Sequence, residues 1–168
     1  ARAFALTIYK SQSLVDIRST LTVLSNVIEN EISSHVAYCK SWGLSEHILE
    51  NTLEDVATVA YTRYVLERGI SGDLADLHAA LAPCALGYAE IGRRLINDPI
   101  TKLEGNPYRS WIELYAGENS QKFARTQGLL LDRLAADIKP DSVRWVQLCE
   151  TFKTATRMEI AFWQQALN

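Results

Sequence analysis

The chain contains few residues that interrupt or crosslink a fold. Four prolines and eight glycines are spread over 168 residues, and the three cysteines are Cys39, Cys84 and Cys149. An odd number of cysteines without CxxC spacing argues against a disulfide framework or a zinc knuckle, and is typical of a reducing cytoplasm. No apolar run approaches the roughly 18 residues of a transmembrane helix, and a secretory signal pattern is absent. We therefore expect a soluble, cytoplasmic protein with no membrane partner.

An excess of basic residues is also missing. The 17 lysines and arginines are outnumbered by 20 acidic residues, which gives a net charge of −3. Nucleic-acid binding is therefore not expected, because it depends on a basic surface. The sequence has no glycine-rich phosphate loop, no G-x-S-x-G elbow and no credible Ser–His–Asp set. With 48% hydrophobic residues, the chain is expected to bury one core as a single domain.

Helical spacing dominates what remains. Apolar residues recur at three- and four-residue steps, whereas alternating strand patterns are scarce. The pattern predicts helices over about 14–40, 45–69, 73–97 and 108–115, then a helix bearing Phe123, Leu130 and Leu134, and a last helix after Pro140. Short loops between such helices favour an all-α, antiparallel bundle.

The beginning of the chain falls inside an apolar pattern. Phe4 and Ile8 share one helical face, but no capping residue precedes them. We therefore interpret Ala1 as the middle of a longer helix whose first half lies upstream of this sequence.

Glu159 interrupts the apolar face of the last helix. It lies seven residues after Phe152 and seven before Ala166, so the spacing predicts that it points inward with them. Burial disfavours a charged carboxylate, which is how a glutamate becomes a general acid near neutral pH. A carboxyl satisfied by an arginine or a buried tyrosine is an equally reasonable interpretation from spacing alone.

Cys84 and Tyr88 occupy one face of the helix predicted over 73–97. Pro83 lies inside this pattern, so we expect a bend that leaves the Ala79 carbonyl without its helical donor. The bend would place a thiol and a phenol together at its inner face, so we expect Cys84, Tyr88 and Glu159 to point into a shared interior where a pocket can form. A buried free cysteine that acts only as a small hydrophobic residue is the alternative.

A metal site is not expected. Glu31 and His35 are four residues apart, but di-iron bundles use Glu-x-x-His pairs on two helices, and this chain has none. We therefore predict neither a metal nor another cofactor.

Four sequence blocks resemble the TenA family, also called thiaminase II. The segment Ala82–Gly92 resembles its Pro-Cys-x-x-x-Tyr-x-Glu-x-Gly signature, and Pro107–Tyr115 resembles its Pro-Tyr-x-x-Trp-Ile-x-x-Tyr block. Tyr61–Tyr64, followed by Gly72–Leu74, looks like the segment ahead of the cysteine helix. Phe152–Trp163 resembles the closing F-x(6)-E-x-x-F-W pattern. The resemblance covers essentially the whole chain.

This resemblance implies a haem-oxygenase-like helical bundle that binds no haem. It also implies hydrolysis of aminopyrimidines in thiamin salvage, from 4-amino-5-aminomethyl-2-methylpyrimidine to the hydroxymethyl compound, and cleavage of thiamin itself. Carried over by position, Cys84 is the nucleophile and Glu159 the proton donor. Tyr88 and Tyr115 contact the pyrimidine. Two further residues are implied to line the pocket, namely Tyr61 and Phe162. The family also implies a homotetramer.

One family feature is absent from the sequence. An aspartate on the first long helix of the family falls before Ala1 in this register, so we expect the chain to be a TenA-like domain without the family's N-terminal helical segment. Two other interpretations remain open. In the first, this is a non-catalytic pyrimidine-binding or regulatory protein. In the second, it is the C-terminal domain of a multifunctional thiamin-biosynthesis protein with a pyrimidine kinase upstream.

Overall fold

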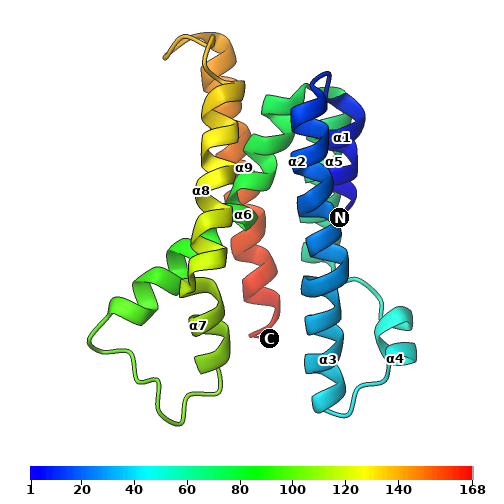
Figure 1. The fold of residues 1–168 in the computed structure, drawn as a ribbon, viewed down its shortest axis with the longest axis vertical. Coiled ribbons are helices and arrows are strands. Elements are labelled where there is room, and N and C mark those ends of the chain that lie inside the picture. The colour runs from blue at the N-terminus through cyan, green and yellow to red at the C-terminus, as the bar shows by residue number, and fades with distance from the viewer. Residues whose placement is uncertain (168) are drawn as a thin grey trace. The chain divides into compact units, whose positions relative to one another are not determined.

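The computed structural model describes residues 1–167, which form helices joined by loops and contain no strand (Figure 1). The all-α prediction is therefore confirmed. The elements are α1 (Arg2–Lys10), α2 (Leu14–Asn26), a π-helix η1 (Val27–Ile32), α3 (Ser33–Ser41), α4 (Glu46–Asn51), α5 (Val56–Ser71), α6 (Leu74–Asn97), α7 (Arg109–Ala116), α8 (Glu118–Leu134) and α9 (Val143–Gln165). Among the described residues, no helix has the length and apolar content needed to cross a bilayer.

The chain forms two compact units. The first comprises Ala1–Leu77 together with the chain's end from Ala161, and the second comprises His78–Ile160. Helices α6 and α9 contribute to both units, with α6 beginning in the first and α9 ending there.

Short polar side chains determine where several helices begin. The hydroxyl groups of Ser13 and Ser45 accept hydrogen bonds from the backbone N–H groups of Asp16 and Ile48, at 3.4 and 3.3 Å. Asp55 accepts from the N–H of Ala57 at 2.9 Å. Each bond satisfies a donor that the first helical turn leaves unpaired.

The cap at Asp55 corrects one prediction. The single helix expected over 45–69 is two helices, because α4 ends at Asn51 and α5 begins only at Val56. Asp55 adopts an extended backbone conformation at this break. An aspartate favours such a position since its side chain bonds to the backbone outside the helix.

The helix predicted over about 14–40 is continuous but not uniform. Its middle, Val27–Ile32, is a π-helix between α2 and α3. The apolar residues of this helix are largely open to solvent in the described chain: Leu21 and Ile28 are exposed, and so are Glu31 and His35.

In the first unit, α1 packs against α2 and α5 (Figure 1). Phe4 is buried in this contact region of the chain. The Nζ atom of Lys10, the last residue of α1, donates hydrogen bonds to the carbonyl oxygens of Gly72 and Ile70, at 2.6 and 3.4 Å. A cation beside carbonyls at the end of α5 stabilises that terminus.

The turn from α5 to α6 is built around a buried carboxylate, Asp76. Its Oδ2 accepts from the Asp73 backbone N–H at 3.0 Å, and its Oδ1 lies 3.4 Å from Nη2 of Arg68. Asp73 in turn caps α6 by accepting from the N–H groups of Ala75 and Asp76. A Cβ atom on Gly72 would collide with the Asp76 side chain, so this network requires glycine there.

In the second unit, side chains or backbone groups of α6 interact with residues of α7, α8 and α9. Small residues, including Ala82 and Ala89, form much of its buried surface and permit close approach. α6 continues through Pro83, which is itself buried. The large side chains predicted to be buried on α9 are not: Phe152 is 40% exposed, while Thr151 and Ala155 are buried.

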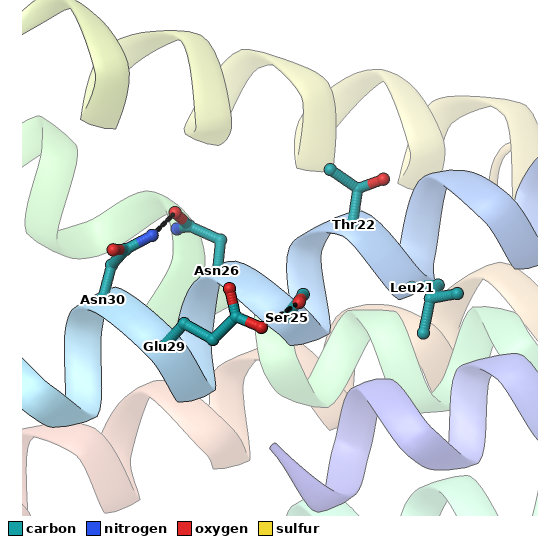
Figure 2. A pocket seen from close by; sticks show the side chains of 6 residues that line it. All are labelled: Leu21, Thr22, Ser25, Asn26, Glu29 and Asn30. Atoms are coloured by element: carbon teal, nitrogen blue, oxygen red, sulfur yellow. Dashed lines mark hydrogen bonds between the residues drawn. The ribbon is translucent and has the colours of Figure 1, made fainter.

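A shallow groove of about 410 Å³ lies on the first unit along α2 and η1 (Figure 2). Its polar side chains bond to one another along the helix, Ser25 to Glu29 and Asn30 to Asn26, each at 2.9 Å. The groove contains none of the site residues predicted from the sequence.

Candidate functional site

The second unit brings together four of the six predicted site residues. Cys84 and Tyr88 lie one turn apart on α6, Tyr115 lies on α7 and Glu159 on α9. Cys84 is exposed, so the prediction that it is enclosed in the interior is wrong for the described chain. The exposed thiol is open to an incoming molecule, which a nucleophile requires.

Tyr88 belongs to an aromatic cluster with two residues of α7. Its ring centroid lies 5.1 Å from that of Tyr115 and 5.9 Å from that of Trp111. Trp111 and Tyr115, one turn apart on α7, are 4.7 Å apart. All three pairs are tilted, an arrangement that aromatic quadrupoles favour.

Trp111 was not among the residues predicted for the site. Its position four residues before Tyr115 places both rings on one face of α7, which is a signal the sequence contains. Trp111 is half-buried, so its ring also has an accessible part.

Gly92 allows α6 and α7 to approach closely. A Cβ atom at this position would lie 2.7 Å from the Ala116 nitrogen and the Tyr115 carbonyl carbon. Backbone atoms cannot move aside as a side chain can, so only glycine fits. The contact holds the end of α7 against α6, which brings Tyr115 to Tyr88.

Glu159 is buried and forms a side-chain hydrogen bond with Tyr88. Burial raises the pKa of Tyr88 far above its ordinary value, with further increases from the charge of Glu159, from Cys84, from the hydrogen bond to Glu159 and from Tyr115. Tyr88 therefore remains a phenol, and its hydroxyl donates a hydrogen bond to the carboxyl group of Glu159. It can orient this carboxyl, but it cannot serve as a base.

His78 is a further buried titratable residue on α6. Burial lowers the pKa of this histidine to about 4, because the interior disfavours the imidazolium cation. His78 is therefore neutral at physiological pH.

Tyr61 and Phe162 lie in the first unit. Tyr61 is buried on α5, and Phe162 is half-buried near the end of α9. Thr58 and Gln165 join these helices by a side-chain hydrogen bond of 2.9 Å. Tyr61 and Phe162 each lie three residues from this bond along their helices.

Residues 1–167 contain no group of three histidine, cysteine or acidic side chains that could hold a metal ion. Glu31 and His35 are exposed on η1 and α3.

The sequence matches the TENA/THI-4/PQQC family over residues 1–168. The chain belongs to this family. The matched range includes the four blocks that resemble TenA proteins, and with them Cys84, Tyr88, Tyr115 and Glu159.

Three curated relatives illustrate the range of the family. An uncharacterised protein of Haemophilus influenzae is 42% identical, over all of this chain and 76% of its own length. An aminopyrimidine aminohydrolase of Halalkalibacterium halodurans is 34% identical, over all of this chain and 74% of its own length. A putative hydroxymethylpyrimidine/phosphomethylpyrimidine kinase of Schizosaccharomyces pombe is 33% identical, over 98% of this chain but 29% of its own length.

A solved structure has the same fold. A TenA family transcription regulator from a Silicibacter species is 40% identical and superimposes with a TM-score of 0.89, over 99% of this chain and 74% of that protein. The predicted fold class, an all-α helical bundle of the TenA family, is thus confirmed.

Proposed function

We propose that this protein is an aminopyrimidine aminohydrolase of thiamin salvage. The observation that carries the proposal is the position of Tyr88, which bonds to Glu159, packs on Tyr115 and lies one turn from Cys84. These are the side chains to which the family resemblance assigns the reaction. A relative named aminopyrimidine aminohydrolase, 34% identical over the whole chain, supports the assignment.

The residues have complementary roles in this mechanism. The Cys84 thiolate adds to a ring carbon of the pyrimidine, and the displaced electron pair moves to a ring nitrogen that Glu159 protonates. The electron pair then returns to expel the amino group, which leaves as ammonia because it is protonated as an ammonium group, and a methylene group doubly bonded to the ring remains. Water adds to this methylene and releases one proton to the solvent, which balances the proton that left with ammonia. Departure of the thiolate then restores the aromatic ring, and the ring nitrogen returns its proton to Glu159.

Tyr88 contributes by orientation rather than by proton transfer. Its raised pKa keeps the hydroxyl protonated, so it continues to donate to Glu159 throughout the cycle. Tyr115 and Trp111 offer aromatic faces on which a flat pyrimidine can stack. Two residues of the first unit, Tyr61 and Phe162, stay in the proposal as ring contacts through the family resemblance alone.

Removal of the nucleophile tests this proposal. Cys84→Ala is expected to reduce ammonia release from 4-amino-5-aminomethyl-2-methylpyrimidine by on the order of a thousandfold or more, because the covalent route is lost. Cys149→Ala, at a half-buried cysteine of α9, is the matched control and is expected to keep its activity. An unchanged rate in Cys84→Ala would show that the nucleophile is assigned wrongly.

The second candidate is a pyrimidine-binding regulator, which the name of the Silicibacter protein favours. Calorimetry separates the two functions, because a regulator binds the aminopyrimidine without releasing ammonia. The kinase name of the yeast relative belongs to a protein of which this chain covers 29%, so we do not extend it to this chain.

We further propose that the protein is cytoplasmic and assembles as a homotetramer whose protomers are TenA-like domains. Light scattering of the purified full-length protein tests the assembly, and a stable monomer would contradict it.

A further inference from the structure

Gln121 of α8 makes two hydrogen bonds that converge on the aromatic cluster. Its Nε2 donates to the carbonyl oxygen of Tyr115 at 2.9 Å and to that of Ala89 at 2.8 Å. Tyr115 carries one ring of the cluster, and Ala89 directly follows Tyr88, which carries another. One side-chain amide therefore links the backbone of Tyr115 to the backbone of the residue next to Tyr88.

The two acceptors explain why this side chain is an amide. Both are carbonyl oxygens, so the residue must supply two N–H donors from one terminal group, as glutamine does. The carbonyl of Tyr115 lies in the last turn of α7, where helical acceptors lack helical donors. Gln121 supplies such a donor, and the bond fixes the end of α7 on α6.

Gly92 and Gln121 act on the same junction in different ways. Gly92 sets how closely α7 can approach α6, since it leaves no space for a side chain against Tyr115 and Ala116. Gln121 holds the two helices at that distance through directional bonds. Close approach alone does not fix the rotation of α7, whereas a bond to one carbonyl does.

We propose that Gln121 is a positioning residue for the pyrimidine, which sets the angle between the rings of Tyr88 and Tyr115. This inference rests on the proposed aminohydrolase function. Gln121 itself does not touch the reacting atoms in this scheme. Because Cys84 and Glu159 are not bonded to it, its loss should weaken ring binding more than it slows the chemical step.

Kinetics of two variants test the proposal. Gln121→Leu removes both donors at nearly the same length, and KM for 4-amino-5-aminomethyl-2-methylpyrimidine is expected to rise about tenfold, as the loss of two hydrogen bonds implies. The change in kcat is expected to stay below about threefold. Gln147→Leu, at an exposed position of α9, is the matched control and should change neither constant.

Gln121→Glu supplies a readout that a purely structural role would not move. At neutral pH its carboxylate can only accept, so it repels both carbonyls, but the protonated acid can donate one bond. The kcat/KM of Gln121→Glu relative to wild type is therefore expected to recover as pH is lowered toward about 5. A flat ratio, or an unchanged KM in Gln121→Leu, would overturn the proposal, and the pH ratio decides the matter if the leucine variant does not fold.

Near-ultraviolet circular dichroism separates this inference from the proposed function. The aromatic signal of the substrate-free protein is expected to change in Gln121→Leu and not in Gln147→Leu, because only the former alters the ring cluster. If wild type neither binds nor hydrolyses the aminopyrimidine, the proposed function fails. The dichroism comparison then still shows whether Gln121 orders the rings, and equal spectra would overturn that role as well.

Discussion

Two buried carboxyl groups, Asp76 in the first unit and Glu159 in the second, occupy contrasting environments. Asp76 is 3% exposed and faces the Arg68 guanidinium and a backbone N–H group at the start of α6. Glu159 is 8% exposed and is bonded by the phenol of Tyr88, beside an aromatic cluster. Burial is therefore similar, whereas the donors differ.

The donors indicate what each carboxyl can do. A guanidinium and a backbone N–H both stabilise the charged form of a carboxyl group. Asp76 therefore has a structural role at the turn where α5 ends and α6 begins. A phenol donates one neutral hydrogen bond, which orients a carboxyl without placing a positive charge beside it, so the carboxyl keeps its capacity to exchange a proton. The comparison teaches that the kind of donor distinguishes a structural carboxyl from a candidate acid, which burial alone does not.

The largest effect is expected at Glu159, where a substitution tests directly whether this carboxyl differs in role from Asp76. Glu159→Gln retains the shape but removes the exchangeable proton, so kcat for the aminopyrimidine is expected to fall by about 10²- to 10⁴-fold. Glu150→Gln, at an exposed position of the same helix, is the control. Ammonia release measures both. A variant that keeps full activity would place Glu159 with Asp76 as a structural residue.

A pH titration of stability sharpens the comparison of the two carboxyl groups only if a third buried group, His78, is taken into account, because His78 also titrates as the protein is acidified. Its pKa is lowered from 6.5 to about 4 on folding, so below pH 6.5 the unfolded chain binds a proton that the folded chain does not. Stability is expected to fall by about 3 kcal/mol as pH decreases from 6.5 toward 4, and to stay higher above 6.5.

Urea unfolding at several pH values measures this loss. His78→Gln is expected to flatten the dependence between pH 6.5 and 4, whereas His47→Gln, at an exposed histidine of α4, keeps it. Equal slopes in wild type and His78→Gln would mean that other groups account for the acid sensitivity. The pH dependence of stability that remains in His78→Gln then reports the contribution of Asp76 and Glu159.

The smallest expected effect is on stability at Asp76. Asp76→Asn weakens the contact with Arg68 and is expected to lower the free energy of unfolding by about 2 kcal/mol. Glu67→Gln removes the other carboxylate near Arg68, which is exposed and 3.9 Å away, so its cost should be below about 1 kcal/mol. Equal losses in the two variants would remove the distinction. Neither change is expected to alter kcat.

The sequence predicted the helices well where polar caps and turn residues marked their ends. The bounds of α6 follow from Asp73 and from the Asn97–Pro99 turn, and the structure agrees. The break before Asp55 was missed because neither proline nor glycine marks it, although an aspartate before Val56 is a capping signal. The π-helix has no such marker, since its residues also suit an α-helix.

The site was predictable in its residue types but not in its exposure. Helical spacing placed Cys84 and Tyr88 on one face and pointed Glu159 inward, and the structure joins Tyr88 to Glu159. Cys84 is nevertheless exposed: the buried face of α6 consists largely of alanines, which a search for large apolar residues does not reveal. Gln121 was not singled out, because a glutamine on α8 shows its importance only when its acceptors on α6 and α7 are known.

Gly92 also limits which substitutions near this site an active protein can tolerate. The position has no side chain, yet any replacement would force Tyr115 away from α6 through a collision with its backbone. A library of variants selected for activity should therefore recover glycine at 92 about as strictly as cysteine at 84. The need for a correctly placed site thus constrains Gly92 as strongly as a reacting residue, although Gly92 has no side chain that could take part in the reaction.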